Sequence, residues 1–487
     1  MAPAWATDLI AEGLAGHVLF GFNVVDRAQL AALTASLRAA RADVLIGIDE
    51  EGGDVTRVAH LEGSPYPGNA ALGRVDDPDL TRRVYRAIGV ELHDLGINLN
   101  LAPTVDVNTA DDNPIIGTRS FGADPVCAAA HSAAAVTGLA QAGVIACAKH
   151  FPGHGATTAD SHVELPTTDA PMEVLRAREL PPFVAAFAAG VPAIMTAHIR
   201  LPELTGDLPA TFSRAALVDL LRTELGFTGV VITDALEMRG STDYAGGIAE
   251  AAVLALAAGA DLLCIGAEVD AALVEACAAG IATAIGDGRL PLARVEEAAE
   301  RVAAMSARLT ADAATLAARP GAAGTDTDSS GAGSDPTGSG SDPTGFGIGY
   351  AAARGAVGVE GSLDGLTTAV VVQLESESSI AVGLVPWGLG PHLNGTEQHR
   401  VHAAGTDPDE LRATAGGRPL VFVGRNLHRM PGAPALIEAL AATNPVVVVE
   451  MGWPSSWRPA GVRAFVTTYG ASRANGRAAA ELLGLAA

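Results

Sequence analysis

The chain has 487 residues, 49% apolar but only 4% aromatic, so it is long enough for two or three domains with cores of mostly Ala, Val and Leu. It carries 31 Lys and Arg against 55 Asp and Glu, a formal net charge of −24. Such a field repels phosphate backbones and anionic lipid surfaces, so we expect no nucleic-acid partner and no membrane partner. We interpret the excess of negative charge as a feature that keeps the protein soluble.

The start of the chain and its cysteines favour a cytoplasmic location. Residues 1–8 lack the basic start and the uninterrupted apolar core of a signal peptide. No stretch reaches the ~20 apolar residues of a membrane-spanning helix. The cysteines are scattered without CxxC spacing, which indicates free thiols in a reducing compartment rather than disulfides or zinc ligands. They are Cys127, Cys147, Cys264 and Cys277.

Strand and helix signals alternate through the first two-thirds of the chain, which predicts an α/β fold with a parallel sheet and right-handed crossovers. Short apolar runs predict strands at 17–20, 44–48, 97–101, 144–148, 193–196, 230–233 and 260–265. Helical spacing predicts helices at 28–41, 79–95, 127–142, 176–189, 213–225 and 247–258. About seven units are visible, where a TIM-type (β/α) barrel has eight. A doubly wound open sheet is the competing architecture, but titratable residues after nearly every strand favour the barrel.

The composition changes after a helix predicted at 292–317. Residues 320–347 are mostly Gly, Ser, Asp, Thr and Pro, with Ser-Asp-Pro-Thr-Gly occurring twice, which predicts a disordered linker. Val-rich strands at 368–373, 419–423 and 445–450 and helices at 411–415, 433–442 and 473–483 predict a smaller α/β/α sandwich. The expected domains are a barrel over 1–319, a linker over 320–347 and a sandwich over 348–487. Loop-like segments of the sandwich at 385–388, 424–426 and 451–454 are interpreted as turns.

The most distinctive stretch is residues 148–155, Ala-Lys-His-Phe-Pro-Gly-His-Gly, followed by Asp160, Ser161 and His162. A buried strand that ends in a glycine-rich loop with titratable groups is how α/β barrels build active sites. Another apolar strand ends in a carboxylate, Asp234, which is costly unless the charge is paired or used, with helix capping as the structural alternative. Two further motifs follow strands: residues 49–57, Asp-Glu-Glu-Gly-Gly-Asp-Val-Thr-Arg, and residues 113–122, Asn-Pro-Ile-Ile-Gly-Thr-Arg-Ser-Phe-Gly.

Over residues 15–317 these motifs resemble glycoside hydrolase family 3, and within it the β-N-acetylhexosaminidase branch. The resemblance implies a TIM-type barrel followed by an α/β sandwich, and no cofactor. Members usually have one more strand upstream of residues 4–16. A displaced start codon that truncates the chain, or a barrel closed by a helix, would each account for its absence here.

The resemblance also implies a role for each motif residue. Asp234 would be the nucleophile that forms a covalent glycosyl–enzyme intermediate, as in retaining glycosidases. His162, oriented by Asp160, would replace the usual carboxylic acid as general acid and base. Substrate contacts would come from Asp49, Arg57, Arg119, Lys149 and His150, with His198 lining the pocket. Asp106 is expected to organise its loop, and Glu237 receives no role.

Asp54 departs from the family pattern, which has Arg at this position. The reversed charge is expected to remove a salt-bridge partner from Glu51 or its neighbours, with reduced stability or altered specificity near that strand end.

The expected function is release of terminal β-linked N-acetylglucosamine from small carbohydrates such as muropeptides or chitin fragments. Three alternatives stay open: an N-acetylglucosaminide phosphorylase, a β-glucosidase, and a sugar-binding barrel without turnover. A catalytic zinc site is disfavoured because its candidate ligands include no helical i, i+4 pair and Lys149 would repel the ion, so no metal is expected there. Those candidates are His150, His154, Asp160, His162 and His198.

Overall fold

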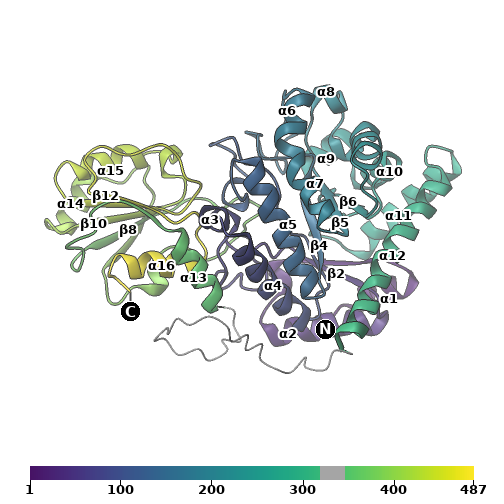
Figure 1. Cartoon of the computed structure of the whole chain (residues 1–487), viewed down its shortest axis with the longest axis horizontal. Helices are drawn as coiled ribbons and strands as arrows, with labels where there is room; N and C mark the ends of the chain where they lie inside the picture. Colours follow the sequence, from purple (N-terminus) through teal and green to yellow (C-terminus); the bar gives the residue numbers. More distant parts are fainter. Residues whose placement is uncertain (318–345, 487) are drawn as a thin grey trace.

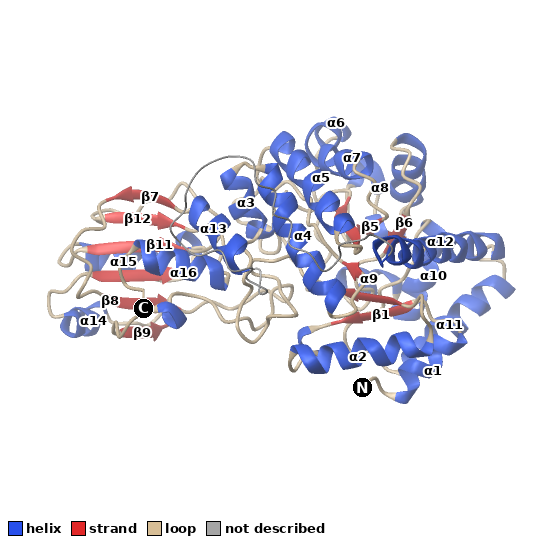
Figure 2. Ribbon diagram, turned by 60° about the horizontal axis from the view of Figure 1, so that its bottom comes forward, coloured by secondary structure: helices blue, strands red, loops and turns tan. Residues whose placement is uncertain are grey.

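The computed structural model describes residues 1–317 and 346–486 and shows two bodies, each built around its own sheet (Figures 1 and 2). The predicted linker lies outside the described residues, apart from 346 and 347, which begin a helix, α13 (Phe346–Ala356).

The first body contains a six-stranded curled sheet in which every neighbouring pair is parallel. Its strands follow chain order: β1 (Gly16–Leu19), β2 (Leu45–Ile48), β3 (Leu99–Asn100), β4 (Ile145–Phe151), β5 (Ala193–Thr196) and β6 (Val230–Ile232). Every residue of β2, β4, β5 and β6 is buried, which explains why these segments are continuous apolar runs. This curled parallel sheet, covered by helices, confirms the predicted barrel class.

The seventh predicted strand is only partly present. Of residues 260–265, Leu262 alone forms a bridge, parallel to Ile232 of β6. In the described part of the chain a helix, α1 (Ala4–Glu12), and not a strand, precedes β1. A cavity of about 440 Å³ is lined by both β1 and residues 262–267, together with α1, so these two edges of the curled sheet are not joined by backbone pairing.

Helices cover the outside of the curled sheet (Figure 2). In chain order they are α2 (Arg27–Ala40), α3 (Asn69–Val75), α4 (Pro78–Asp94), α5 (Pro125–Gln141), α6 (Met172–Val174), α7 (Leu180–Ala188), α8 (Pro202–Thr205), α9 (Arg239–Ala245), α10 (Ile248–Ala258), α11 (Ala271–Gly286) and α12 (Leu292–Ala317), with π-helical turns at Leu175–Glu179 and Ala215–Glu224. The starts of α4 and α5 are set by Asp-Pro pairs. Asp77 and Asp124 accept hydrogen bonds from the first free NH groups, and each following proline begins the helix with a pre-set φ.

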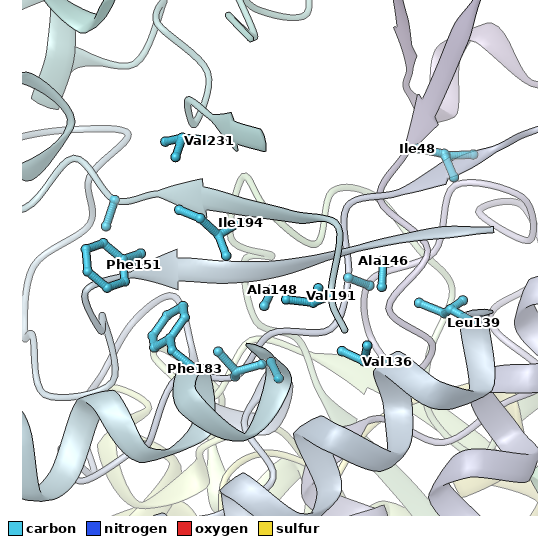
Figure 3. Close-up of a cluster of buried hydrophobic side chains, with 14 of the residues drawn as sticks. Ile48, Val136, Leu139, Ala146, Ala148, Phe151, Phe183, Val191, Ile194 and Val231 are labelled. Atoms are coloured by element: carbon cyan, nitrogen blue, oxygen red, sulfur yellow. The ribbon is translucent and has the colours of Figure 1, made fainter. Parts of the chain in front are cut away.

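The main core lies between the sheet and these helices. Figure 3 shows Phe151 of β4 beside Phe183 of α7, and Ala146 of β4 near Val136 and Leu139 of α5, in a cluster that also contains Ile48, Ile194 and Val231 of the other strands. The rings of Phe151 and Phe183 meet edge to face with their centroids 5.3 Å apart. This packing fixes the end of β4, which carries Lys149 and His150 and leads into the loop that contains Asp160 and His162.

The second body is a three-layer sandwich. Its sheet has the order β7-β12-β11-β10-β8-β9, with β7 antiparallel to β12 and the other pairs parallel. The strands are β7 (Gly358–Gly361), β8 (Val370–Leu374), β9 (Gln398–Val401), β10 (Leu420–Gly424), β11 (Val446–Glu450) and β12 (Ala464–Thr467). One core contains Val371 and Ala479 of α16 (Arg473–Leu482), and the other contains Val372 and Leu436 of α15 (Ala433–Ala441). Adjacent strand residues therefore face opposite helical layers, and α14 (Pro408–Ala415) adds to the second core.

Among the helices of the described residues, none combines the length and the apolar character that crossing a membrane requires.

Candidate active site

A cavity of about 530 Å³ lies where β2, β4, β5 and β6 end at their carboxyl side. This is the edge at which parallel barrels collect functional groups. Of the predicted site residues, Asp49, Arg57, Arg119, Lys149, His150, His162 and Asp234 line it. Asp160 and His198 do not line it but contact residues that do.

A buried network of alternating charges forms one side of the pocket. Lys149 Nζ lies 2.6 Å from Asp49 Oδ1 and 2.7 Å from Glu51 Oε1. Arg119 binds the two oxygens of Glu51 through Nη2 and Nε, at 2.7 and 2.9 Å. Burial alone would raise the pKa of the Glu51 carboxyl, but the Arg119 and Lys149 cations lower it well below its usual value. The network holds two cations in fixed positions beside the pocket.

Glu51 is therefore a central site residue that the sequence analysis missed. It is 3% exposed and joins the motif of residues 49–57 to the one that contains Arg119. The signal was available in the motif itself, where a second carboxylate stands two positions after Asp49.

Glu51 has two cationic partners in the structure, Arg119 and Lys149, so it does not lack a salt bridge. The expected effect of Asp54 on stability or specificity stays a prediction. Asp54 itself connects the two bodies. Its Oδ2 accepts a hydrogen bond from the Thr118 hydroxyl at 2.6 Å, and its Oδ1 accepts one from the backbone NH of Ala471 at 2.8 Å.

Asp106 holds the loop after β4. Its carboxylate accepts hydrogen bonds from the backbone NH of His150 at 3.2 Å and from that of His154 at 2.7 Å, and it lies 2.8 Å from His150 Nδ1. Burial alone would raise the pKa of Asp106, but the His150 imidazole lowers it below its usual value. The second ring nitrogen of His150, Nε2, is left facing the Arg119 guanidinium at 3.5 Å.

Asp234 stands on the turn that follows β6, where its Oδ1 accepts the backbone NH of Ala235 at 2.8 Å. Burial alone would raise the pKa of its carboxyl, but the imidazoles of His150, His198 and His162 lower it below its usual value. His198 is fully buried behind the turn, with Nε2 3.0 Å from the Ala235 carbonyl oxygen and Nδ1 2.9 Å from Thr211 Oγ1. The structure thus places His198 as a support for the Asp234 turn.

His162 and Asp160 form a pair in the loop after β4. His162 Nδ1 lies 2.8 Å from Asp160 Oδ1, and the same oxygen accepts the backbone NH of His162 at 2.8 Å. The loop is attached at Ser161, whose hydroxyl lies 3.3 Å from His154 Nε2 and whose carbonyl accepts the NH of Gly240. Because Nδ1 is occupied, Nε2 is the nitrogen of His162 that is available for proton transfer.

The second body supplies part of the pocket wall. Residues 380–385, from the loop after β8, line the cavity. Arg57 fixes this loop by donating to the carbonyl oxygens of Ala381 at 2.7 Å and Val382 at 3.2 Å. The interpretation of residue 385 as part of a mere turn was therefore incomplete, because Val385 belongs to the wall. Glu237, which had received no role, also lines the cavity and accepts the NH of Ala267 at 2.6 Å.

The alternative zinc site is not assembled by these histidines. Within residues 1–317 and 346–486, the set His150, His154, Asp160, His162 and His198 does not bring three ligand atoms within 4.8 Å of one another.

Fold and pocket together define a two-body barrel enzyme, in which a carboxylate and an Asp-paired imidazole share one polar pocket. A family model described as the glycosyl hydrolase family 3 N terminal domain matches residues 3–305. The chain belongs to glycosyl hydrolase family 3, which confirms the resemblance found in the motifs.

Named relatives agree with this assignment. A β-hexosaminidase A from Pseudoalteromonas piscicida is 35% identical over 62% of this chain, and a β-hexosaminidase from Tolumonas auensis is 40% identical over 51%. The matches span 55% and 74% of those two proteins. Among solved structures, a family 3 β-N-acetylglucosaminidase from Paenibacillus sp. str. FPU-7 superposes with a TM-score of 0.86 at 32% identity, covering 100% of this chain and 94% of that one.

Proposed function

We propose that the protein is a retaining β-N-acetylglucosaminidase that removes terminal β-linked N-acetylglucosamine from small carbohydrates in the cytoplasm, with muropeptides or chitin fragments as natural substrates. The observation that carries the proposal is that Asp234 and the Asp160-paired His162 line one cavity of about 530 Å³ beside two fixed cations. The β-hexosaminidase names of the relatives support the same substrate class.

In the first step, a carboxylate oxygen of Asp234 attacks the anomeric carbon while the bond to the leaving oxygen breaks. The lowered pKa of Asp234 keeps this carboxylate ionised at neutral pH. His162 gives its Nε2 proton to the departing oxygen. Asp160 holds the imidazole ring in place through Nδ1 while this proton is transferred. The sugar is then esterified to Asp234 and the alcohol leaves.

In the second step, the neutral His162 takes a proton from water at Nε2, and the water oxygen attacks the anomeric carbon from the side that the alcohol left. The ester bond to Asp234 breaks, and the sugar departs with its original β configuration. Asp49, Lys149, His150 and Arg119 contact the ring hydroxyls and the acetamido group, and charged partners make such hydrogen bonds roughly twice as strong as neutral ones.

A panel of 4-nitrophenyl β-glycosides tests the proposal. We expect kcat/KM to be highest for the N-acetylglucosaminide, lower for the N-acetylgalactosaminide and lowest for the glucoside, and proton NMR to show the β anomer first. A faster glucoside identifies a β-glucosidase. A folded protein that hydrolyses none of the three is a sugar-binding barrel instead.

Phosphorolysis is a second candidate, favoured by one feature of the pocket. The proposed acid and base of this pocket is an imidazole, His162, and not a second carboxylic acid, so a phosphate dianion meets less repulsion in the second step. Comparing products with and without inorganic phosphate separates the two reactions. Sugar 1-phosphate with a phosphate-dependent rate identifies a phosphorylase, and free sugar at a phosphate-independent rate identifies a hydrolase.

A further inference from the structure

Three side chains of metal-ligand type meet outside the pocket, where α3 packs against α5 (Figure 1). Cys127 and His131 lie one helical turn apart on α5, so they share a face of that helix. Asp76 ends α3 in the left-handed conformation, at φ 55°. The sulfur, the ring nitrogen and a carboxylate oxygen all lie within 4.8 Å of one another.

The separations of these atoms suit a shared ion, although the Cys127 thiol also donates a long hydrogen bond to Asp76. Asp76 Oδ1 lies 3.5 Å from His131 Nε2 and 3.7 Å from Cys127 Sγ. Nitrogen-to-oxygen hydrogen bonds cluster near ~2.9 Å. Around a tetrahedral Zn²⁺, bond lengths of about 2.0–2.3 Å place nitrogen and oxygen ligands ~3.3 Å apart and sulfur and oxygen ligands ~3.6 Å apart.

His131 supplies an independent observation. The residue is 0% exposed, and its Nε2 makes no hydrogen bond with any residue that the structure describes. Its other nitrogen, Nδ1, lies 2.8 Å from the hydroxyl of Thr81 on α4. In metal-binding histidines, one ring nitrogen typically makes a hydrogen bond to a neighbouring group and the other binds the metal, and His131 has this arrangement. An unsatisfied buried polar atom is otherwise destabilising.

We propose that Asp76, Cys127 and His131 bind one Zn²⁺, with water as the fourth ligand on the exposed side of Asp76. The mixed thiolate, imidazole and carboxylate set suits zinc among the common divalent ions, and binding releases the proton of the Cys127 thiol. All four cysteines are free in the structure, as predicted from the sequence, and the proposal makes Cys127 a ligand when zinc is bound.

The position of the site gives the ion a structural role. The His131 ring stacks on Phe121 with centroids 5.3 Å apart, and Phe121 follows two residues after Arg119 of the charge network. Zinc therefore joins the end of α3 to α5 and braces the segment that delivers Arg119, without entering the pocket.

Zinc binding to the full-length chain tests the proposal. The chelator-treated parent is equilibrated with ZnCl₂, and bound zinc is counted by elemental analysis beside Cys127→Ser, Asp76→Asn and a matched thiol control, Cys277→Ser. We expect both site variants to bind one zinc fewer than the parent and the control. The melting temperature should rise with zinc in the parent and the control more than in the site variants.

Cobalt(II) gives a second readout specific for the thiolate. The parent and Cys277→Ser should show a near-ultraviolet thiolate-to-metal band that Cys127→Ser lacks. Asp76 is exposed and Cys127 partly exposed, so both variants should fold, which circular dichroism checks. Equal zinc content in the parent and Cys127→Ser, or no zinc in a folded parent, would overturn the proposal.

Discussion

Asp234 keeps a negative charge at a half-buried position because the imidazoles of His150, His198 and His162 lower the pKa of its carboxyl. The pKa of Asp234 is lowered although burial acts in the opposite direction. A nucleophile of this kind has to be ionised before the substrate arrives.

Asp234→Asn removes the proposed nucleophile with little change in shape. We expect kcat to fall by about 10⁴-fold or more, since loss of a covalent nucleophile has effects of this order. Steady-state hydrolysis of a 4-nitrophenyl β-N-acetylglucosaminide is the measurement, with Asp207→Asn as a surface control on the same body. A variant that keeps the parental rate would refute the mechanism.

Glu50 is a second buried carboxyl, with the opposite behaviour. Burial raises the pKa of Glu50 from 4.5 to about 7, although the Thr56 hydroxyl and the backbone NH groups of Val58 and Arg57 lower it in part. Between these two pH values the folded protein holds a proton that the unfolded chain has lost. The contribution of Glu50 to stability is therefore greatest below pH 4.5 and falls until pH 7.

Glu50→Gln removes this titration and keeps an oxygen acceptor for the two NH groups. Relative to the parent, we expect the variant to gain stability from pH 5 to pH 8 by up to about 3 kcal/mol. Urea unfolding at both pH values measures the gain. The same change at exposed Glu12 should produce no such difference, and a parallel pH profile for parent and Glu50→Gln would contradict the prediction.

At the scale of elements, the loop after β8 places apolar side chains at the mouth of the pocket. Leu384 and Ile380 are 94% and 62% exposed although both line the cavity. Phe22, 67% exposed and stacked on Phe20 at 5.6 Å, belongs to the same lining. Exposed apolar groups beside a polar sugar site suit the part of a substrate beyond the scissile bond.

Leu384→Ser with Ile380→Ser should therefore lower kcat/KM about tenfold for an octyl β-N-acetylglucosaminide, which equals ~1.4 kcal/mol of lost apolar contact. The methyl glycoside should be affected much less. Competition between the two glycosides measures the ratio, and Leu292→Ser, which removes an exposed leucine away from the pocket, is the control. An unchanged octyl-to-methyl ratio would contradict this assignment.

Which elements the sequence could predict follows from their burial. The fully buried strands β2, β5, β10 and β11 are almost entirely apolar, and their predicted ranges agree with the structure to within one or two residues. The strands β7 and β9 lie at the two edges of their sheet, carry polar residues, and gave no apolar signal. Residues 260–265 are apolar enough for a strand, but only Leu262 finds a pairing partner.

The same distinction applies to the site. Asp49, Lys149, Arg119 and Asp234 were predictable because local motifs at strand ends carry them. The contact of Asp54 with Ala471 and the hydrogen bonds of Arg57 to residues 381–382 could not be predicted, because they join positions more than 300 residues apart. Spacing along the chain contains no information on such contacts.

At the scale of the whole molecule, Asp54 joins the two bodies by accepting the backbone NH of Ala471 in the second body, while Thr118 of its own body donates to its other oxygen. Asp54→Arg removes both acceptors and places a cation near Arg425, whose charge Asp54 offsets. Each lost hydrogen bond to a carboxylate is worth about 1.5–3 kcal/mol. We expect a lower unfolding midpoint and, by small-angle scattering, a larger radius of gyration. Asp207→Arg, whose side chain is 99% exposed, should leave both unchanged; an unaltered Asp54→Arg profile would show that other contacts suffice for docking.

The nine residues from Asp49 to Arg57 bind in two directions. Asp49 and Glu51 fix the cations of the pocket, while Asp54 and Arg57 grip the partner body. A chimera that carried the C-terminal body of a related protein would therefore disturb the sugar site, even if all the motifs of the N-terminal body were kept. An exchange of the C-terminal body between members of this fold therefore has to include residues 49–57 together with the body that they contact.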